Sequence, residues 1–183
     1  QVFDAASNRT ELTASIGATK DFKNTYQFDS LQRLTDIVQQ SQSGGNAVTS
    51  KHITQSFNAL GQLLSLARYQ STGVTNPVAS STFTFDTLNR LTGIAHKQGA
   101  TNLNTYTYSF DALSRPTSVS STAEGTSTYS YDITSQVTAA THTGQPNETY
   151  GFDANGSRNT TGYTVGTNNQ TTAGLGFTFT FDS

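Results

Sequence analysis

Residues 26–34 read Tyr-Gln-Phe-Asp-Ser-Leu-Gln-Arg-Leu, and this stretch predicts the fold. Tyr26 and Phe28 flank a polar residue, which is the period-2 alternation of a half-buried strand. Asp29 follows, and an aspartate at the first position of a turn accepts hydrogen bonds from backbone N–H groups further along the turn. Arg33 and Leu34 then begin a second alternating segment. The stretch therefore predicts one β-hairpin, made of a strand, a four-residue turn and a strand.

The pair of an aromatic residue and an Asp or Asn recurs along the chain, and each occurrence is called an anchor below. The eight anchors are Phe3-Asp4, Phe28-Asp29, Phe57-Asn58, Phe85-Asp86, Phe110-Asp111, Tyr131-Asp132, Phe152-Asp153 and Phe181-Asp182. Their polar members lie 25, 29, 28, 25, 21, 21 and 29 residues apart. Repeats of this period are the signature of a repeat architecture. We expect residues 1–183 to form a single array of about 16 strands that is a piece of a longer repetitive chain.

The residues around the anchors repeat as well. A second aromatic precedes the acid by three residues in six copies: Tyr26, Phe83, Tyr108, Tyr129, Tyr150 and Phe179. An arginine or glutamine follows the acid by four residues in five copies: Arg33, Gln62, Arg90, Arg115 and Gln136. Arg9 and Arg158 follow by five residues, which predicts that these two copies are one residue longer.

The fourth turn position favours glycine, and two copies have one there, Gly61 and Gly156. We expect weaker turns where Gln32, Asn89, Ser114 or Ser135 replaces it, although asparagine tolerates a positive φ. Two segments have helical spacing, one with Leu31, Leu34, Ile37 and Val38 and the other with Leu60, Leu63 and Leu64. We predict strands there, because the same segments of the other copies alternate and contain β-branched residues.

The composition fits many strands that each have one polar face. Hydrophobic residues make up 33% of the chain, charged residues 12%, and Ser and Thr together about 30%. This is too polar for a thick, two-sided core. The chain has no Cys, which excludes disulfides and thiolate metal sites. The pI of about 5.8 argues against nucleic-acid binding and against a polybasic membrane patch.

The segments Tyr129–Asp132, Tyr26–Leu34 and Tyr150–Gly156 resemble the YD or RHS repeat, whose pattern is roughly Tyr-x-Tyr-Asp-x-x-Gly-Arg-Leu. The resemblance implies an all-β fold in which tandem hairpins form one long antiparallel sheet that curls or spirals into a shell. In bacterial toxins of this family the shell encloses a toxic domain, while wall-associated proteins and teneurins display the repeats at the cell surface. The resemblance thus implies a secreted or cell-surface location. Family shells often end in a segment with an Asp-Pro-x-Gly motif, and no Asp-Pro occurs in this chain.

No residue pattern points to catalysis or to a cofactor. Seven of the 12 acidic residues are anchor residues, so we interpret them as part of the scaffold. His52, His96 and His142 are interpreted as neutral surface residues, with His96 and His142 at equivalent strand positions, each ten residues after an anchor. No spacing typical of metal ligands or of a nucleophilic serine is present.

Three hypotheses for the function follow. The first is a non-catalytic structural scaffold, the wall of a shell that encloses cargo or spaces other domains. The second is an adhesion module that binds glycans or cells through exposed aromatic residues. The third is a subunit of an extracellular fibre, because uncharged strands rich in Thr, Gln and Asn favour edge-to-edge growth. The expected partners are further repeats or neighbouring subunits, an enclosed toxin domain or surface glycans, with no nucleic acid and no membrane insertion.

Overall fold

The computed structural model describes residues 1–166, 169–174 and 176–181, and this part of the chain contains strands and no helix. The chain divides into two compact units, Gln1–Tyr106 and Thr107–Ser183, and each is described by itself. The strands are β1 (Val2–Phe3), β2 (Arg9–Ile16), β3 (Thr19–Phe28), β4 (Leu34–Ser41), β5 (Lys51–Phe57), β6 (Leu63–Tyr69), β7 (Ala79–Phe85), β8 (Leu91–Gln98), β9 (Thr101–Phe110), β10 (Pro116–Ser121), β11 (Gly125–Tyr131), β12 (Val137–His142), β13 (Glu148–Thr149), β14 (Thr164–Val165), β15 (Thr171–Gly174) and β16 (Phe177–Thr178).

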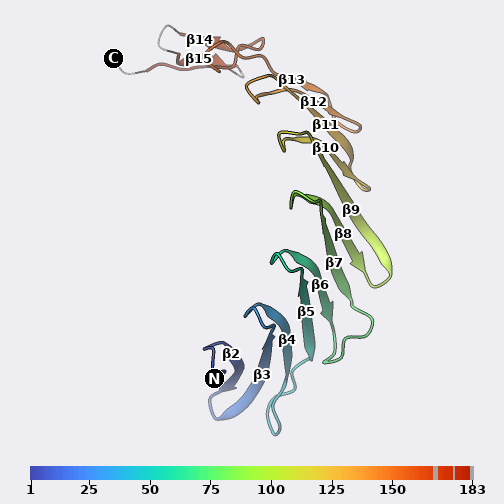
Figure 1. Cartoon of the computed structure of the whole chain (residues 1–183). Helices are drawn as coiled ribbons and strands as arrows, with labels where there is room; N and C mark the ends of the chain where they lie inside the picture. Colours follow the sequence, from blue (N-terminus) through green and yellow to red (C-terminus); the bar gives the residue numbers. More distant parts are fainter. Residues whose placement is uncertain (167–168, 175, 182–183) are drawn as a thin grey trace. The chain divides into compact units, whose positions relative to one another are not determined.

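The strands from β1 to β13 form one sheet in which the hydrogen-bonded order is the sequence order. In the first unit, each strand from β1 to β8 pairs antiparallel with the next, as the blue-to-green part of Figure 1 shows. The predicted fold class, an all-β sheet of tandem hairpins, is confirmed. Leu34 and Leu63 each begin a strand, so strand and not helix is also correct for the two segments with helical spacing.

In the second unit, β10 to β13 pair antiparallel in order. The strands β14, β15 and β16 form a separate three-stranded antiparallel sheet. The described residues therefore contain the expected 16 strands, although the last four, β13 to β16, are only two to four residues long.

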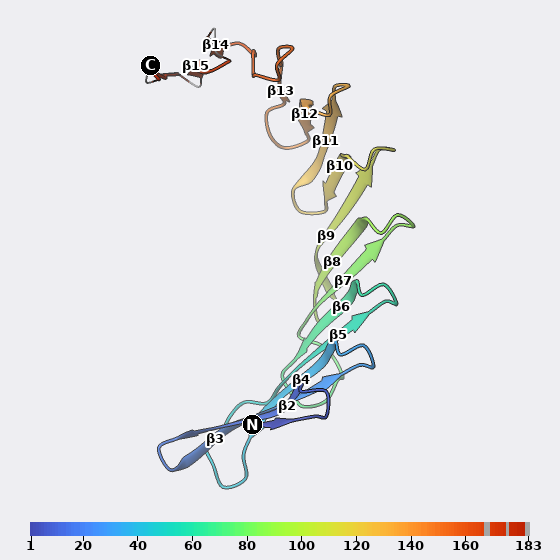
Figure 2. The same cartoon turned by 60° about the vertical axis from the view of Figure 1, so that its left-hand side comes forward.

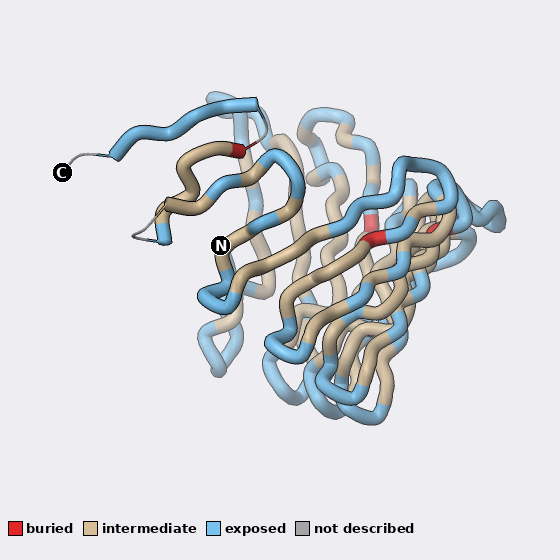
Figure 3. Tube along the Cα trace, turned by 90° about the horizontal axis from the view of Figure 1, so that it is seen from above, coloured by how far each residue is buried: buried red, intermediate tan, exposed pale blue. Residues whose placement is uncertain are grey.

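Few side chains are buried. Among the described residues only His52, Ser121, Ala140 and Gly174 are buried, and the first three are 7%, 7% and 4% exposed (Figure 3). The absence of a thick core, expected from the polar composition, is confirmed for this part of the chain. Backbone ladders and contacts between side chains on neighbouring strands must therefore hold the sheet together.

The anchors lie in a regular row. Because strands alternate in direction and an anchor follows every second strand, the turns after β1, β3, β5 and β7 lie along one edge of the first unit (Figure 2). The connections at the opposite edge vary in length, and residues 42–50 and 70–78 form the two long ones. The variable repeat spacing is thus accommodated at the edge that has no anchors.

Candidate functional site

Each anchor residue in the described part of the chain organises a turn through one carboxylate or amide group. Asp29 Oδ1 accepts hydrogen bonds from the backbone N–H groups of Leu31 (2.9 Å) and Arg33 (3.0 Å). Asp29 Oδ2 accepts from Arg33 Nε at 2.6 Å. The backbone N–H of Gln32 donates to the carbonyl of Asp29, and the N–H of Asp29 donates to the carbonyl of Arg33. This is a tight turn followed by a bulge, and the strand register shifts next to it, between Gln27 and Phe28.

The fourth turn position has a positive φ in all seven anchor turns of the described residues. The residues and their φ angles are Ser7 (67°), Gln32 (64°), Gly61 (84°), Asn89 (64°), Ser114 (63°), Ser135 (70°) and Gly156 (82°). The turns without glycine were expected to be weaker, yet they adopt the same backbone geometry. Anchor hydrogen bonds therefore hold non-glycine residues in a conformation that ordinarily costs them about 1–2 kcal/mol.

The prediction of two longer copies is wrong. The backbone N–H groups of Asn8 and Ser157 donate to Asp4 Oδ1 and Asp153 Oδ1, respectively. In the second copy the backbone N–H of Arg33 donates to Asp29 Oδ1 in the same way. Asn8 and Ser157 therefore occupy the fifth turn position, and the arginines that follow them lie one residue further along the chain. The spacing of the arginine alone was misleading, because it does not show which residue closes the turn.

The arginines connect each hairpin to the next one. Arg33 Nη1 donates to the carbonyl of Asn58 in the following anchor at 2.8 Å, and its guanidinium lies 4.9 Å from the centroid of the Phe57 ring. Arg115 repeats this arrangement, with Nη1 3.1 Å from the carbonyl of Asp132 and the guanidinium 4.5 Å from the Tyr131 centroid. One side chain thus closes its own turn and holds the neighbouring turn.

Glutamine at the arginine position also donates a hydrogen bond to a backbone carbonyl of the following turn. Gln62 Nε2 donates to the carbonyl of Asn89 at 3.1 Å, and Gln136 Nε2 donates to that of Gly156 at 3.3 Å. Gln62 Oε1 also accepts from Asn58 Nδ2 at 2.6 Å, so in this copy an amide pair stands in place of the ion pair. The sequence showed the Asn and Gln departures separately, and only the geometry shows that they complement each other.

Hydrogen bonds lower the pKa of five anchor carboxylates, those of Asp4, Asp29, Asp86, Asp111 and Asp132. In Asp29, Asp86 and Asp111, the backbone hydrogen bond from the arginine four residues on is the largest cause that lowers the pKa below its ordinary value. In Asp132 the backbone of Gln136 has this role, and in Asp4 the side chain of Asn8 does. A carboxylate with a lowered pKa and with its oxygens already bonded is poorly suited to general acid–base chemistry at neutral pH.

The other predicted anchor residues are distributed as follows. The aromatic residues on strands before a turn are Phe3, Tyr26, Phe28, Phe57, Phe83, Phe85, Tyr108, Phe110, Tyr129 and Tyr131. Tyr150, Phe152, Phe179 and Phe181 lie outside the strands, and Asp182 lies outside the described residues. The ion pairs Arg33–Asp29, Arg90–Asp86 and Arg115–Asp111 have N···O distances of 2.6–2.7 Å. Arg158 instead lies 4.4 and 4.6 Å from the ring centroids of Tyr150 and Tyr163.

The histidines divide into two kinds. His52 was expected at the surface, but it is only 7% exposed, with Nε2 3.0 Å from Asp36 Oδ1 and Nδ1 2.9 Å from the carbonyl of Thr72. That prediction is wrong, because residues 70–78 bring the carbonyl over the ring. His96 and His142 do occupy equivalent positions, since each Nδ1 is hydrogen-bonded to a serine fifteen residues earlier. No group of three potential metal-binding side chains forms within residues 1–166, 169–174 and 176–181.

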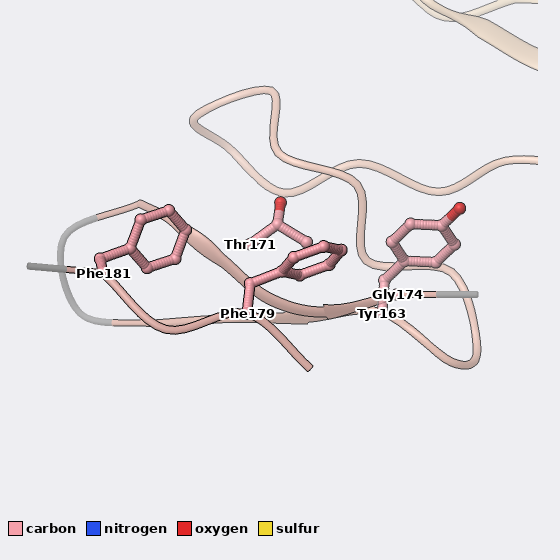
Figure 4. A pocket seen from close by; sticks show the side chains of 5 residues that line it. All are labelled: Tyr163, Thr171, Gly174, Phe179 and Phe181. Carbon is pink, nitrogen blue, oxygen red and sulfur yellow. The ribbon is translucent and has the colours of Figure 1, made fainter. Parts of the chain in front are cut away.

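Hollows open on the described part of the second unit, and two of them are lined by several aromatic rings. One, of about 340 Å³, is lined by Tyr163, Thr171, Gly174, Phe179 and Phe181 (Figure 4). A Cβ at Gly174 would come within 2.7 Å of the Tyr163 ring, so only glycine lets the ring lie there. The other, of about 570 Å³, lies over β11 and β12, and Glu148 and Arg158 line it together with aromatic rings. The second hollow therefore combines apolar walls with charged groups.

Comparison with known proteins supports the fold. No family model and no curated protein matches the chain. The solved structure of the TcdB2-TccC3-Cdc42 complex matches 75% of the chain with a TM-score of 0.56 at 19% identity. The TcdB2-TccC3-TEV structure matches 86% of it with a TM-score of 0.58 at 20% identity.

The chain spans about 8% of the length of each matching chain. At this identity the likeness shows the fold alone. In the part of the chain that the structure describes, no helix has the length and apolar character needed to cross a bilayer. The two likenesses support the predicted fold, an all-β sheet of tandem hairpins.

Proposed function

We propose that this chain is a non-catalytic structural segment of a large secreted or cell-surface RHS/YD-repeat protein. Its hairpin sheet forms part of a wall that encloses a cargo domain, such as a toxin, or spaces other domains. The observation that supports this most directly is the side-chain bridge from one anchor turn to the next. Arg33, Gln62, Arg115 and Gln136 each donate to a backbone carbonyl of the following turn.

A wall with little buried surface needs such bridges. Apolar burial is the main stabilising contribution in most domains, and this sheet has very little of it. The bridges add hydrogen bonds and ring contacts between neighbouring hairpins, which is where a repeat protein gains its stability. Arg33 and Arg115 are occupied in this role, and each also pairs with the carboxylate of its own anchor. This use of the charged residues favours a mechanical function over a chemical one.

A row of leucines at the turn tips supports contacts with more protein. Leu31, Leu60 and Leu88 occupy the same turn position in the first unit and are 61%, 69% and 63% exposed. Leu113 occupies that position in the second unit and is 69% exposed. Exposed apolar side chains gathered on one edge mark an interaction surface. In the proposed wall, this edge contacts further repeats of the same chain or a neighbouring subunit.

Limited proteolysis of the whole chain tests the proposal. Proteinase K should cut first in residues 42–50 and 70–78, the long connections, and should leave the hairpins with their anchor turns as resistant fragments. A continuous, bridged sheet resists cleavage because a protease must unfold several residues to bind them. Rapid digestion within the strands, at the same rate as in the connections, would contradict a wall function.

A further inference from the structure

One histidine of the first unit joins a long connection to the sheet. His52 of β5 lies opposite Val38 of β4 and Tyr69 of β6 on one face, and it is only 7% exposed. Residues 70–78, called the strap below, connect β6 to β7. The carbonyl of Thr72 in the strap lies 2.9 Å from His52 Nδ1. The strap is therefore fastened to this face of the sheet through the histidine ring.

Little else holds the strap in place. Every residue from 70 to 76 is exposed. At the end of the strap, the N–H of Val78 donates to the carbonyl of Arg68 at 2.8 Å, next to the start of β7. Among the described residues, the bond to His52 is the one hydrogen bond that joins residues 70–77 to the sheet. The position of the strap over the ring therefore depends on this contact.

Both ring nitrogens of His52 face hydrogen-bond acceptors. Nδ1 faces the carbonyl of Thr72, and Nε2 lies 3.0 Å from Asp36 Oδ1. A carbonyl oxygen only accepts hydrogen bonds, and so does an ionised carboxylate. A neutral imidazole has one N–H group, whereas the charged imidazolium has two. Only the charged ring can therefore donate to both groups at once.

The other charged and titratable groups around the ring do not change in the same pH range. Asp36 of β4 lies on the same face as His52 and is its acidic partner. Lys51 and Arg68 line the hollow of about 230 Å³ beside the ring, and the centroid of the Tyr69 ring is 5.8 Å away. The strap and β7 contain no titratable side chain. Aspartate, lysine, arginine and tyrosine ordinarily keep the same charge between about pH 5 and 8, so the histidine is the group that can respond there.

We propose that His52 is a pH-sensitive latch, which fastens the strap when its ring is charged and loosens it when the ring is neutral. The carboxylate of Asp36 is a stronger acceptor than a carbonyl, so the one proton of a neutral ring stays on Nε2. Nδ1 then presents a lone pair to the carbonyl of Thr72, and the two acceptors repel each other. The latched state requires a proton that the released state does not, so acid favours latching. Release uncovers the ring that the strap buries.

The latch does not depend on the proposed wall function, because it concerns one connection within the first unit. Limited proteolysis of the whole chain at about pH 5.5 and about pH 8 tests it, since histidines ordinarily change charge between these values. Residues 42–50, a connection without histidine, are the reference for cleavage by the same protease in the same sample. The ratio of cleavage in the strap to cleavage in residues 42–50 should rise about threefold or more between the two pH values. An equal ratio at both would overturn the proposal.

Three variants separate the latch from other effects of pH. His52→Phe keeps a ring but has no donor, so the cleavage ratio should be high at both pH values. The matched control is His96→Phe, because His96 of β8 is hydrogen-bonded to Ser81 and not to a carboxylate. Its ratio should rise with pH as in the parent. A pH response that persists in His52→Phe, or that disappears in His96→Phe, would show that another group controls the strap.

Asp36→Asn should hold the strap at both pH values. Its side-chain amide can donate to Nε2 of a neutral ring, which then keeps its proton on Nδ1 and its bond to the strap. A parent-like pH response in this variant would contradict the role of the carboxylate.

NMR of the imidazole nitrogens reads the latch without cleavage. In the parent, both nitrogens of His52 should carry a proton at about pH 5.5, and only Nε2 should carry one at about pH 8. A ring that is neutral at both values, or a neutral ring with its proton on Nδ1, would overturn the mechanism.

Discussion

The turn at Asn58 offers a direct test of the backbone geometry that every anchor shares. Gly61 occupies the fourth position with φ +84°, and no atom lies within 4 Å of a Cβ added there. Gly61→Ala would therefore introduce no steric contact with a neighbour. Its only native-state cost is that of placing an L-residue in the left-handed region, about 1–2 kcal/mol.

The unfolded state partly offsets this cost. Replacing glycine with alanine reduces the conformational entropy of the unfolded chain, which stabilises the folded form by about 0.4–1 kcal/mol. The net effect is a destabilisation of about 0.5–1 kcal/mol, which corresponds to a two- to fivefold rise in the opening equilibrium of this hairpin. Gly61→Asn should cost less, because Asn89 already occupies the same position of the next turn with φ 64°.

Hydrogen exchange measures this opening locally. The amide of residue 61 donates to the carbonyl of Asn58 at 3.1 Å, and the amide of Asn58 donates to that of Gln62 at 3.0 Å. Both amides should exchange about two- to fivefold faster in Gly61→Ala, with a smaller change in Gly61→Asn. Equal damage from Ala and Asn, or no change in either variant, would refute the idea that the turn depends on a left-handed fourth residue.

Three further predictions concern the anchors. Asp132→Ala should speed hydrogen exchange in the hairpins of Asp111, Asp132 and Asp153 but not near Asp29. Asp132→Asn should have a smaller effect, because the side-chain amide of Asn58 accepts the same hydrogen bonds in its own turn. Uniform loss of protection would contradict local coupling. On acidification, the turn at Asp29 should open before the turn at Asn58. Hydrogen bonds lower the pKa of Asp29 in the folded protein. Its contribution to stability is therefore complete above the ordinary pKa of 3.8 and is lost as the pH falls through the pKa of the folded state. Simultaneous opening of the two turns in an NMR titration would refute this. Arg115→Lys should speed exchange in both its own hairpin and that of Asp132, because lysine lacks the planar group that reaches both turns; an effect confined to the first hairpin would contradict the bridge.

The anchor turns and the hairpin order could be predicted from the sequence because both depend on local patterns. The aromatic alternation and the turn aspartate act within about ten residues, so copies such as Tyr26–Leu34 specify their own hairpin. The bridges could not be predicted in the same way. Arg33 reaches Asn58 only after residues 42–50 have returned the chain to the adjacent strand, and the sequence does not reveal the resulting register.

The buried histidine and the hollow were missed for a related reason. His52 is covered by the carbonyl of Thr72, which lies in a connection with no repeat pattern. Ala140 looks like any small residue of an alternating strand. Its burial, at 4% exposed, follows only from the register, which places it between Tyr129 and Glu148 of the neighbouring strands.

The copies that depart from the repeat show which property of the arginine position the array requires. Arg33 and Arg115 form an ion pair with their own anchor, whereas Gln62 cannot, because neither its amide nor that of its anchor residue Asn58 is charged. All three nevertheless donate to a carbonyl of the following turn. The property that they share is therefore a donor of the right length and not a charge. Ion pairs near the surface contribute little to stability in any case. A sheet of this type can thus be built with only 12% charged residues, provided that each turn reaches the next.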